Sequence, residues 1–288
     1  MLSLFHVAYI CDIYHMQNVD SGSLGIGESV MMPIGLAPRA SDFEAFASPA
    51  GEALRSVPWL RDVPRRALEA LAAEAMLHRV PSGSLVFEQA ETPAFAQFLL
   101  AGSVELLGVR GPTEALIELL QPVDLIIPAA VVTGQPYLMR ARVYEEAHLL
   151  LVSAETFRHA MATDHAFCRA ILGCLAAQFR RQVRAAKNLR LRSAEERVGC
   201  YLVALFQRNG DAAPLRLPID KQEIAAQLGM SREVFSRALS GMGQFGMRIV
   251  GKTLEVDDAE AAKSRFPFDP FIDGVELIAP APAKKTRS

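Results

Sequence analysis

Four polar side chains within one short segment carry the chemistry needed to read a base pair. The segment Ser231–Arg237 reads SREVFSR, and it places Arg232, Glu233, Ser236 and Arg237 among only two apolar residues. Arg can donate two hydrogen bonds to O6 and N7 of guanine, Glu can accept from N4 of cytosine, and Ser is adaptable. In a helix these residues share one face, because they form two pairs four residues apart. That face would either read DNA bases or be a solvated stripe of ion pairs.

The residues before this segment predict two helices that would position it. Asp220 and Glu223 have the spacing of a capping box, which starts a helix. Gly229 ends that helix, since glycine readily takes the left-handed conformation of a tight turn. Ser231 caps the next helix, and two short helices joined in this way form a helix-turn-helix. The apolar positions expected to face inward are Ile224, Leu228, Val234, Ala238 and Met242, with Phe235 and Leu239 alongside.

A β-hairpin is predicted directly after the second helix. The stretch MRIVGKTLEV has two apolar runs, Ile249–Val250 and Thr253–Val256, around Gly251–Lys252. A hairpin in this position makes a winged domain. We expect contacts with the DNA backbone from four residues around the polar face: Lys221, Ser231, Ser240 and Lys252.

The run from Leu217 to Val256 resembles the C-terminal domain of the CRP/FNR superfamily of bacterial transcription regulators. It shares the Ser-Arg-Glu sequence, the second Arg four residues after Glu, and the Gly-Lys of the wing. The resemblance implies a homodimer that binds palindromic double-stranded DNA with a TGA core and has RNA polymerase as a partner. A cytoplasmic location is expected from the four cysteines, which have no disulfide-framework spacing. It implies that Arg237 contacts the guanine and Glu233 the paired cytosine. Ser236 matches the branch that reads TTGA, whereas Arg232 matches the branch that reads TGTGA.

Charge and apolar patterning divide the 288-residue chain. Residues 1–150 carry nine Lys/Arg against 17 Asp/Glu, and residues 151–288 carry 21 against 15, as expected for a sensor joined to a phosphate-contacting module. Between Val80 and Val152 short apolar runs alternate with turns, and this region resembles the cyclic-nucleotide-binding β-roll of the same superfamily. Gly83 and Gly102 match the turn positions of that roll. Ala90 and Val123 replace two further turn glycines, so we expect the fold to be kept with adjusted turns.

The ligand cassette of the roll, residues 124–139, departs from the pattern of nucleotide-binding relatives. Ile127 and Pro128 stand where the resemblance implies Gly-Glu, and Pro removes one amide donor. The sequence PYLM replaces the Arg-Ser pair that would neutralise a phosphate. Arg140 and Arg142 follow on the outgoing strand, where we expect them at the surface. The roll is therefore predicted to have an unknown effector other than cAMP, or none. The altered positions are Ile127, Pro128, Pro136, Tyr137, Leu138 and Met139.

One long helix is predicted from Asp164 to Leu191, because apolar residues recur every three or four positions without a proline. The resemblance makes it the dimer helix, which pairs in parallel with the helix of a second copy. A single amphipathic helix lying on the roll is the alternative. The expected interface consists of Phe167, Ile171, Cys174, Leu175, Gln178, Phe179 and Val183.

Together these features predict an α+β protein that is not an enzyme. No nucleophile elbow, paired acid–base residues or P-loop is present in the sequence, and no apolar run has membrane-spanning length. Cys11 and His15 have a spacing that could hold a metal on a helix, but we expect this lone pair to be incidental and no metal to be bound. A ligand-sensing module that regulates a protein partner, with a merely solvated basic half, is the alternative function. The expected segments are an irregular N-terminal extension (1–45), a sensory β-roll domain (46–160), a dimerisation helix and hinge (161–192), a winged helix-turn-helix DNA-binding domain (193–258) and a C-terminal tail (259–288).

Overall fold

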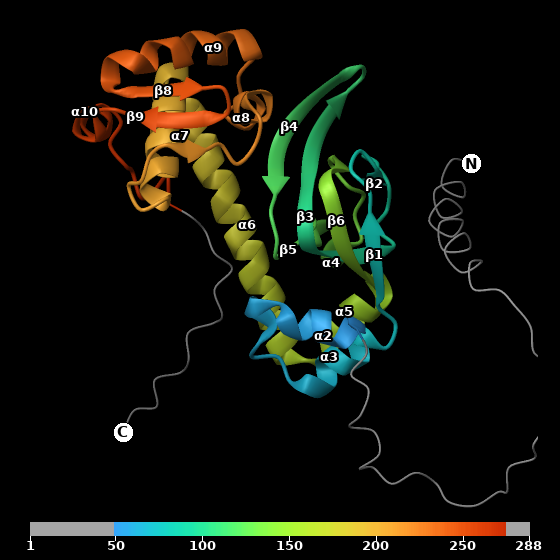
Figure 1. The fold of residues 1–288 in the computed structure, drawn as a ribbon. Coiled ribbons are helices and arrows are strands. Elements are labelled where there is room, and N and C mark those ends of the chain that lie inside the picture. The colour runs from blue at the N-terminus through green and yellow to red at the C-terminus, as the bar shows by residue number, and fades with distance from the viewer. Residues whose placement is uncertain (1–48, 275–288) are drawn as a thin grey trace, which may run out of the picture. The chain divides into compact units, whose positions relative to one another are not determined.

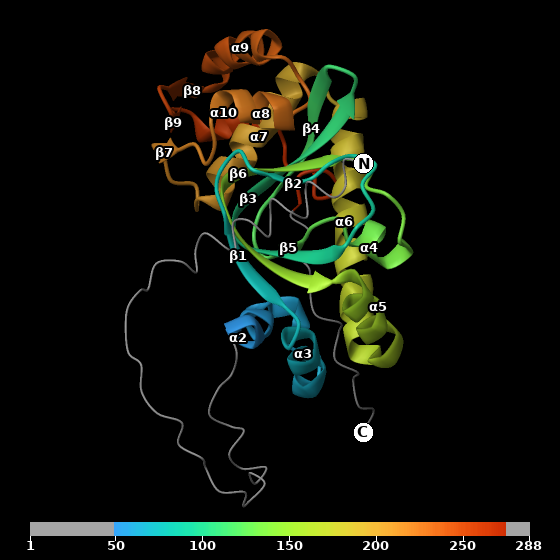
Figure 2. The ribbon, with the colours of Figure 1, turned by 90° about the vertical axis from the view of Figure 1, so that its right-hand side faces the viewer.

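The computed structural model describes residues 49–274, so the predicted extension 1–45 and the last part of the predicted tail lie outside the described residues. Within this range, no helix combines the length and the apolar character that crossing a bilayer requires. The strands form antiparallel sheets and most helices lie in separate runs of the chain, as the α+β prediction requires, and Figures 1 and 2 show their arrangement.

The N-terminal half contains helices around one antiparallel sheet. Its elements are α2 (Pro49–Ser56), η2 (Pro58–Leu60), α3 (Arg65–Ala72), β1 (Met76–Val80), β2 (Leu85–Phe87), β3 (Phe95–Arg110), β4 (Thr113–Leu120), β5 (Asp124–Leu125), α4 (Pro128–Thr133), β6 (Arg140–Ser153) and α5 (Ala154–Thr163).

The predicted β-roll is confirmed. The sheet has the order β1-β6-β3-β4, with β2 paired to β6 and β5 paired to β3. The two longest strands, β3 and β6, pair over most of their length and form its centre. Gly102 has φ +78°, and a Cβ at this position would clash with the carbonyl of Glu146. The turn at Ala90 keeps a left-handed conformation, φ 70°, without glycine, and its amide donates to the Tyr137 carbonyl at 2.8 Å.

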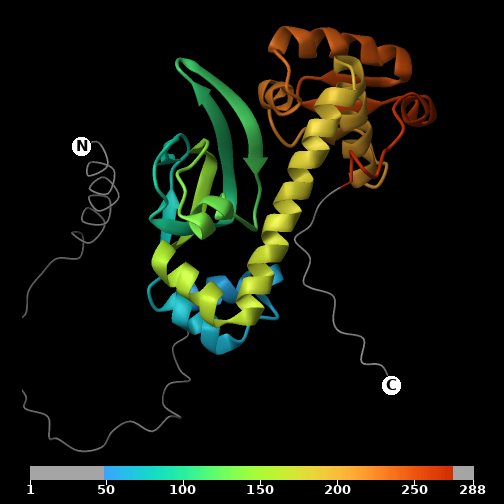
Figure 3. The same cartoon turned by 180° about the vertical axis from the view of Figure 1, so that it is seen from behind.

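A chain of aromatic rings joins the sheet to the helices at one end. Trp59 stacks on Phe98 of β3 at 5.9 Å, Phe98 meets Phe157 of α5 at 6.5 Å, and Phe157 meets Phe167 edge-on at 5.3 Å. Phe167 lies in the first turns of α6 (His165–Leu191). The start of this long helix is therefore part of the core of the N-terminal half, as Figure 3 lets the reader follow.

This packing corrects the predicted dimer interface. Phe167, Ile171 and Cys174 are completely buried inside the chain's own core. Gln178 is also engaged within the chain, since its Nε2 donates to Asp124 Oδ1 at 3.0 Å and to the Leu125 carbonyl at 2.7 Å. Leu175 packs at the edge of the same core. The prediction followed apolar character along the helix and missed that α6 has two apolar faces, one of which the roll covers.

The outward face of α6 carries the remaining apolar side chains. Two of the predicted residues, Phe179 (70% exposed) and Val183, belong to it, together with the exposed Leu172. Ala176 and Ala186 are exposed as well. The five positions follow one another at intervals of four and three residues, which is the spacing of a coiled-coil seam.

The C-terminal half is a second core around a small sheet of order β7-β9-β8. Its elements are α7 (Ala194–Arg208), β7 (Leu215–Arg216), α8 (Lys221–Gln227), α9 (Arg232–Ser240), η3 (Gly241–Phe245), β8 (Met247–Val250), β9 (Thr253–Val256) and α10 (Ala259–Arg265).

The boundary predicted at residue 258 falls inside this core. The short helix expected after the wing is α10, but the chain does not leave the domain at its end. Phe266 is only 1% exposed, and its ring lies against Gly199 of α7, where a Cβ would clash with it. Residues 266–274 then continue across α7 towards the end of α6, and we call them the strap. The predicted tail is therefore structured at least as far as Gly274.

Phe266→Ala should lower the free energy of unfolding of the C-terminal half by about 3–5 kcal/mol, because it leaves a ring-sized cavity against α7. Phe271→Ala is the matched control from the same segment, since that ring is 72% exposed and its loss should cost under about 1 kcal/mol. Urea denaturation followed by circular dichroism measures both. Equal stability of the two variants would show that the strap is not anchored in this core.

Candidate nucleic-acid interface

Helices α8 and α9 form the predicted helix-turn-helix. Gly229 has φ +63°, and its amide and that of Met230 donate to carbonyls of α8 at 3.0 Å each. Ser231 caps α9, because its Oγ accepts from the Val234 amide at 3.3 Å. The inward positions pack as expected: Ile224, Leu228, Phe235 and Met242 are buried, and Val234, Ala238 and Leu239 are half-buried.

The four candidate base-reading residues, Arg232, Glu233, Ser236 and Arg237, are all exposed on α9. Within residues 49–274 neither Arg232 nor Arg237 forms an ion pair, so the i, i+4 pair between Glu233 and Arg237 that a solvated stripe would use is not made. Hydrogen bonds from its own backbone amide and from the Ser231 hydroxyl lower the pKa of Glu233 below its ordinary value. The helix therefore offers two guanidinium groups and one ionised acceptor to solvent.

The predicted capping box at the start of α8 does not form. Asp220 makes no side-chain cap, because its carboxylate forms an ion pair with Lys252 of the wing. Glu223 turns inward, and its Oε2 is buried without a hydrogen-bond partner among the described residues. The local pattern predicted the helix correctly, but a contact with a residue 32 positions later decides where the Asp220 side chain goes.

The residues expected to contact the DNA backbone surround α9, but they differ in exposure and in the bonds that their side chains already make. Lys252 lies in the two-residue turn between β8 and β9, and it is exposed although paired with Asp220. Exposed pairs of this kind contribute at most about 1 kcal/mol, so a phosphate can replace Asp220 at little cost. Lys221 is half-buried at the first position of α8. The hydroxyl of Ser240 donates to the Arg237 carbonyl at 2.8 Å, and that of Ser231 is used in the cap.

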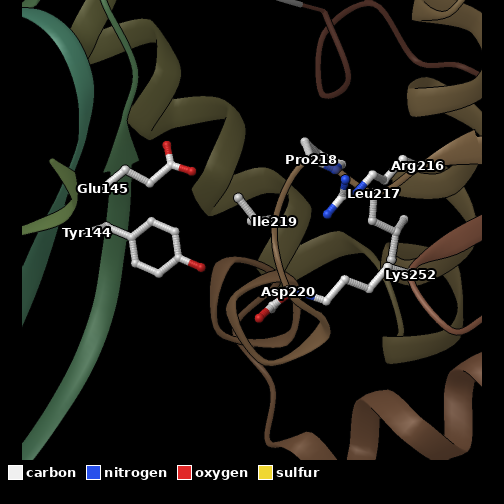
Figure 4. Close-up of a pocket in the computed structure, with 8 residues that line it drawn as sticks. All are labelled: Tyr144, Glu145, Arg216, Leu217, Pro218, Ile219, Asp220 and Lys252. Atoms are coloured by element: carbon white, nitrogen blue, oxygen red, sulfur yellow. Dashed lines mark ion pairs between the residues drawn. The ribbon is translucent and has the colours of Figure 1, made fainter. Parts of the chain in front are cut away.

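Figure 4 shows the pocket beside the Lys252–Asp220 pair. Arg216, Pro218 and Ile219 line it from the segment that leads into α8, and Tyr144 and Glu145 of β6 line it from the other side. Burial and the nearby carboxylates of Glu223 and Asp220 raise the pKa of Tyr144. Carboxylates thus face the pocket together with Lys252 and Arg216, and its charges are mixed.

The ligand cassette has a geometry that does not suit a cyclic nucleotide. Ile127 has φ 40°, and Pro128 begins α4 without an amide hydrogen to donate. Tyr137 is buried, and its ring stacks on Phe87 with the centroids 3.6 Å apart. Leu138, by contrast, is 84% exposed, Pro136 is exposed and Met139 is half-buried. No side chain of the PYLM sequence supplies a charge.

Arg140 and Arg142 are not the free surface residues that we expected. Arg140 donates to both carboxylate oxygens of Glu88 at 2.7–3.0 Å and also pairs with Glu114. Arg142 pairs with Glu105 at 2.9 Å and with Glu114 at 3.3 Å. Three glutamates therefore compensate the two arginines next to the cassette, and an incoming phosphate would have to displace them.

A cavity of about 340 Å³ lies beside the cassette, and α6 forms one wall of it. Its lining is mainly apolar, with Leu120, Ile127, Met139 and Phe179 among the contributing side chains. Glu118 adds a negative charge, and Arg181 already donates to Glu118 at 2.8 Å. This lining is unfavourable for a phosphate and compatible with an uncharged, apolar ligand.

Two groups of residues that matter to this geometry were missed in the sequence. One is the buried cluster of Asp124 and Arg181, of which only the lone acid inside an apolar run gave a signal. The other is the strap, whose repeated Phe, Pro and Asp in FPFDPFID could have been recognised as a packed segment.

Comparison with known proteins agrees with both halves of the chain. The domain model described as "Cyclic nucleotide-binding domain" matches residues 77–164, and that described as "Crp-like helix-turn-helix domain" matches residues 196–261. A CRP-like cAMP-activated global transcriptional regulator of Mycobacterium tuberculosis is 26% identical over 206 residues, which cover 69% of this chain and 92% of that protein. The nitrogen fixation regulation protein FixK of Rhizobium meliloti is 33% identical over 73 residues, 25% of this chain and 35% of its own.

Solved structures show the same fold. FixK2 from Bradyrhizobium japonicum superposes with a TM-score of 0.56 at 19% identity, over 66% of this chain and 96% of that one. A transcriptional regulator of the CRP/FNR family from Eubacterium rectale gives a TM-score of 0.58 at 15% identity, over 72% of this chain and 96% of that one. With a β-roll, a long connecting helix and a winged helix-turn-helix in this order, the chain belongs to the CRP/FNR superfamily of bacterial transcription regulators.

Proposed function

We propose that this regulator binds a palindromic DNA site with a TGA core as a homodimer. The observation that supports this most directly is the exposed polar face of α9, whose two arginines have no ion-pair partner among the described residues. Side chains that are already placed and not engaged can form base contacts without first losing internal bonds. Activity as an enzyme forms no part of the proposal.

Within each half-site we assign the guanine of TGA to Arg237 and the paired cytosine to Glu233. The ionised carboxylate of Glu233 suits the N4 donor of cytosine. Ser236 favours a TTGA half-site, whereas Arg232 fits the TGTGA type, and we favour TTGA. Half-site centres should lie about 34 Å apart, one turn of DNA. Lys221 and Lys252 would hold the flanking phosphates, together with Ser231 and Ser240.

The proposed dimer seam is the outward face of α6. Leu172, Phe179 and Val183 are large apolar side chains exposed on one stripe, with Ala176 and Ala186 between them. The stripe spans about two heptads of the 27-residue helix. Pairing with the same stripe of a second copy would bury it and place two α9 helices on one DNA palindrome.

The effector of the roll is proposed to be something other than cAMP. The cassette lacks a cation that is free for a phosphate, and the neighbouring cavity is apolar with Glu118 in its wall. These features support a sensor whose signal, if it is a small molecule at this place, carries no phosphate.

Arg237→Ala should weaken binding to a TTGA palindrome by about 1–3 kcal/mol and abolish discrimination at the guanine, because a bidentate base contact is lost. Lys252→Ala is the matched control: it should weaken all sequences alike and reduce the salt slope by about one. Competition gel shifts at two salt concentrations measure both effects. Unchanged base preference in Arg237→Ala would mean that α9 does not read DNA as proposed, and no binding by the unaltered chain would favour a protein-regulating module.

Phe179→Asp should convert the protein into a monomer, because it places a charge in the middle of the proposed seam. Leu138→Asp alters an equally exposed apolar residue away from α6 and should leave the dimer intact. Multi-angle light scattering on the full chain gives the mass of each variant. A dimer that persists in Phe179→Asp would place the interface elsewhere.

Calorimetric titration with cAMP should give no saturable binding at physiological concentration. Loss of a buried charge-assisted partner of a phosphate costs about 2–5 kcal/mol, or roughly 30-fold to several thousandfold in affinity. Titration with 5′-AMP serves as the matched reference for nonspecific heat. Micromolar or tighter cAMP binding accompanied by a change in DNA affinity would contradict the assignment.

A further inference from the structure

The strap covers two adjoining cavities at the junction of α6 and α7. It is held there by several contacts: Arg184 donates to the Pro270 carbonyl at 2.7 Å, and Lys187 lies 5.5 Å from the centre of the Phe271 ring. The carboxylate of Asp273, in the strap, accepts hydrogen bonds from Nη1 and Nη2 of Arg192 at 2.6 and 2.7 Å. Both side chains of that pair are only 10% exposed. The path of the strap from α10 can be followed in Figure 1.

The smaller cavity, of about 130 Å³, is lined by three guanidinium groups and one carboxylate. Arg192, Arg197 and Arg208 supply the positive charges, and Asp273 supplies the negative one. Asn188 and Tyr201 complete the polar part of the wall. With Arg192 paired to Asp273, the other two arginines have no carboxylate beside them in the described part of this lining.

Arg197 and Arg208 are held mainly by backbone carbonyls. Arg197 Nη1 donates to the carbonyls of Arg192 at 3.1 Å and Leu189 at 3.4 Å, and Arg208 Nε donates to that of Ala204 at 3.1 Å. Arg197 Nε is buried without a hydrogen-bond partner among the described residues. In the same range, no ion pair connects either arginine to an acid. Arg197 is thus held in place and half-buried, whereas Arg208 is exposed to solvent. No carboxylate of the described residues neutralises either charge.

This arrangement is costly unless something negative occupies the cavity. A buried donor without an acceptor typically costs about 1–3 kcal/mol, and more when it belongs to a charged group. This cost falls on Arg197, because Arg208 is exposed and its charge is solvated. A carboxylate or phosphate would supply the acceptor that Arg197 lacks, since arginine donates to such groups in a planar, two-bonded geometry.

The larger cavity, of about 310 Å³, extends the site towards an apolar surface. It shares Ala204, Arg208 and Asp273 with the smaller one and adds Phe268 of the strap. Phe268 is half exposed, so its ring is available for contact. A ligand that reaches both cavities would therefore be charged at one end and apolar at the other.

We propose that the cavities beneath the strap bind a small organic anion, with its carboxylate or phosphate at Arg197 and Arg208 and its apolar part against Phe268 and Ala204. The walls come from α6, α7, the strap and Leu228 at the end of α8, so a bound anion would join four segments near the hinge around Arg192. This site is separate from the cassette of the roll, and its existence does not depend on which DNA sequence α9 reads.

Isothermal titration of the full chain with phenyl phosphate and with benzoate tests the proposal, and inorganic phosphate serves as the probe without an apolar part. At least one aromatic anion should bind at one site per chain and more tightly than inorganic phosphate. Comparison of the two shows whether the preferred head group is phosphate or carboxylate. Arg197→Gln should weaken this binding about ten- to a hundredfold, as expected for loss of a charged hydrogen-bond donor. Arg237→Ala, on the exposed face of α9, should leave it unchanged.

Asp273→Asn should change anion affinity in the opposite direction to Arg197→Gln. It removes the negative charge that pairs with Arg192 and makes the smaller cavity more positive. It should tighten binding of the same anion several-fold, and this result does not depend on whether Arg197→Gln folds. Phe268→Ala should lower the affinity for the aromatic anion until it approaches the affinity for inorganic phosphate. The proposal is overturned if millimolar anion gives no saturable binding, if Arg237→Ala rather than Arg197→Gln removes it, or if Asp273→Asn weakens it.

Discussion

The ion pair between Asp124 and Arg181 holds the middle of the long helix against the roll, beyond the apolar contacts at the start of that helix. Arg181 Nη2 approaches Asp124 Oδ2 at 2.5 Å, and its Nε donates to Glu118 at 2.8 Å. Burial acts to lower the pKa of Arg181, but the two carboxylates outweigh burial and raise it above the ordinary value. Removing one partner of such a pair costs about 3–5 kcal/mol, because the other charge stays buried. Rotation of α6 about its axis is therefore strongly opposed, and Phe179 and Val183 are kept on the outside.

Whether a feature depends on local or on distant contacts decides whether the sequence could predict it. The helix-turn-helix was predictable because Gly229, Ser231 and the apolar residues after it act locally, within one or two turns. The faces of α6 were not, because Ile171 and Phe179 are both apolar and only contact with the roll distinguishes them. Asp220 was assigned to a cap and instead pairs with Lys252, a partner distant in sequence. Phe266 was assigned to a tail, since nothing near it in sequence indicates that it fits against Gly199.

The candidate sites also differ in how much of each could be predicted from the sequence alone. For α9 the sequence was sufficient to choose the residues, and the structure adds that Arg232 and Arg237 have no ion-pair partner among the described residues. For the cassette, the missing phosphate partners were visible in the sequence, but the glutamates that compensate Arg140 were not. The arginines beneath the strap come from a continuous helix and from the hinge, and only the fold brings them to Asp273. Charge at three separate places is thus handled differently: exposed on α9, compensated beside the roll, and partly uncompensated at the hinge.

We propose that α9 of this regulator reads a palindrome through Arg232 and Arg237, which form no ion pair with any residue of 49–274. Selection of binding sequences from random double-stranded DNA by the full chain, followed by sequencing, tests it most directly. We expect enrichment of two inverted half-sites that contain TGA, with their centres about one helical turn apart. Enriched DNA with no inverted repeat, or no enrichment over the starting pool, would contradict it.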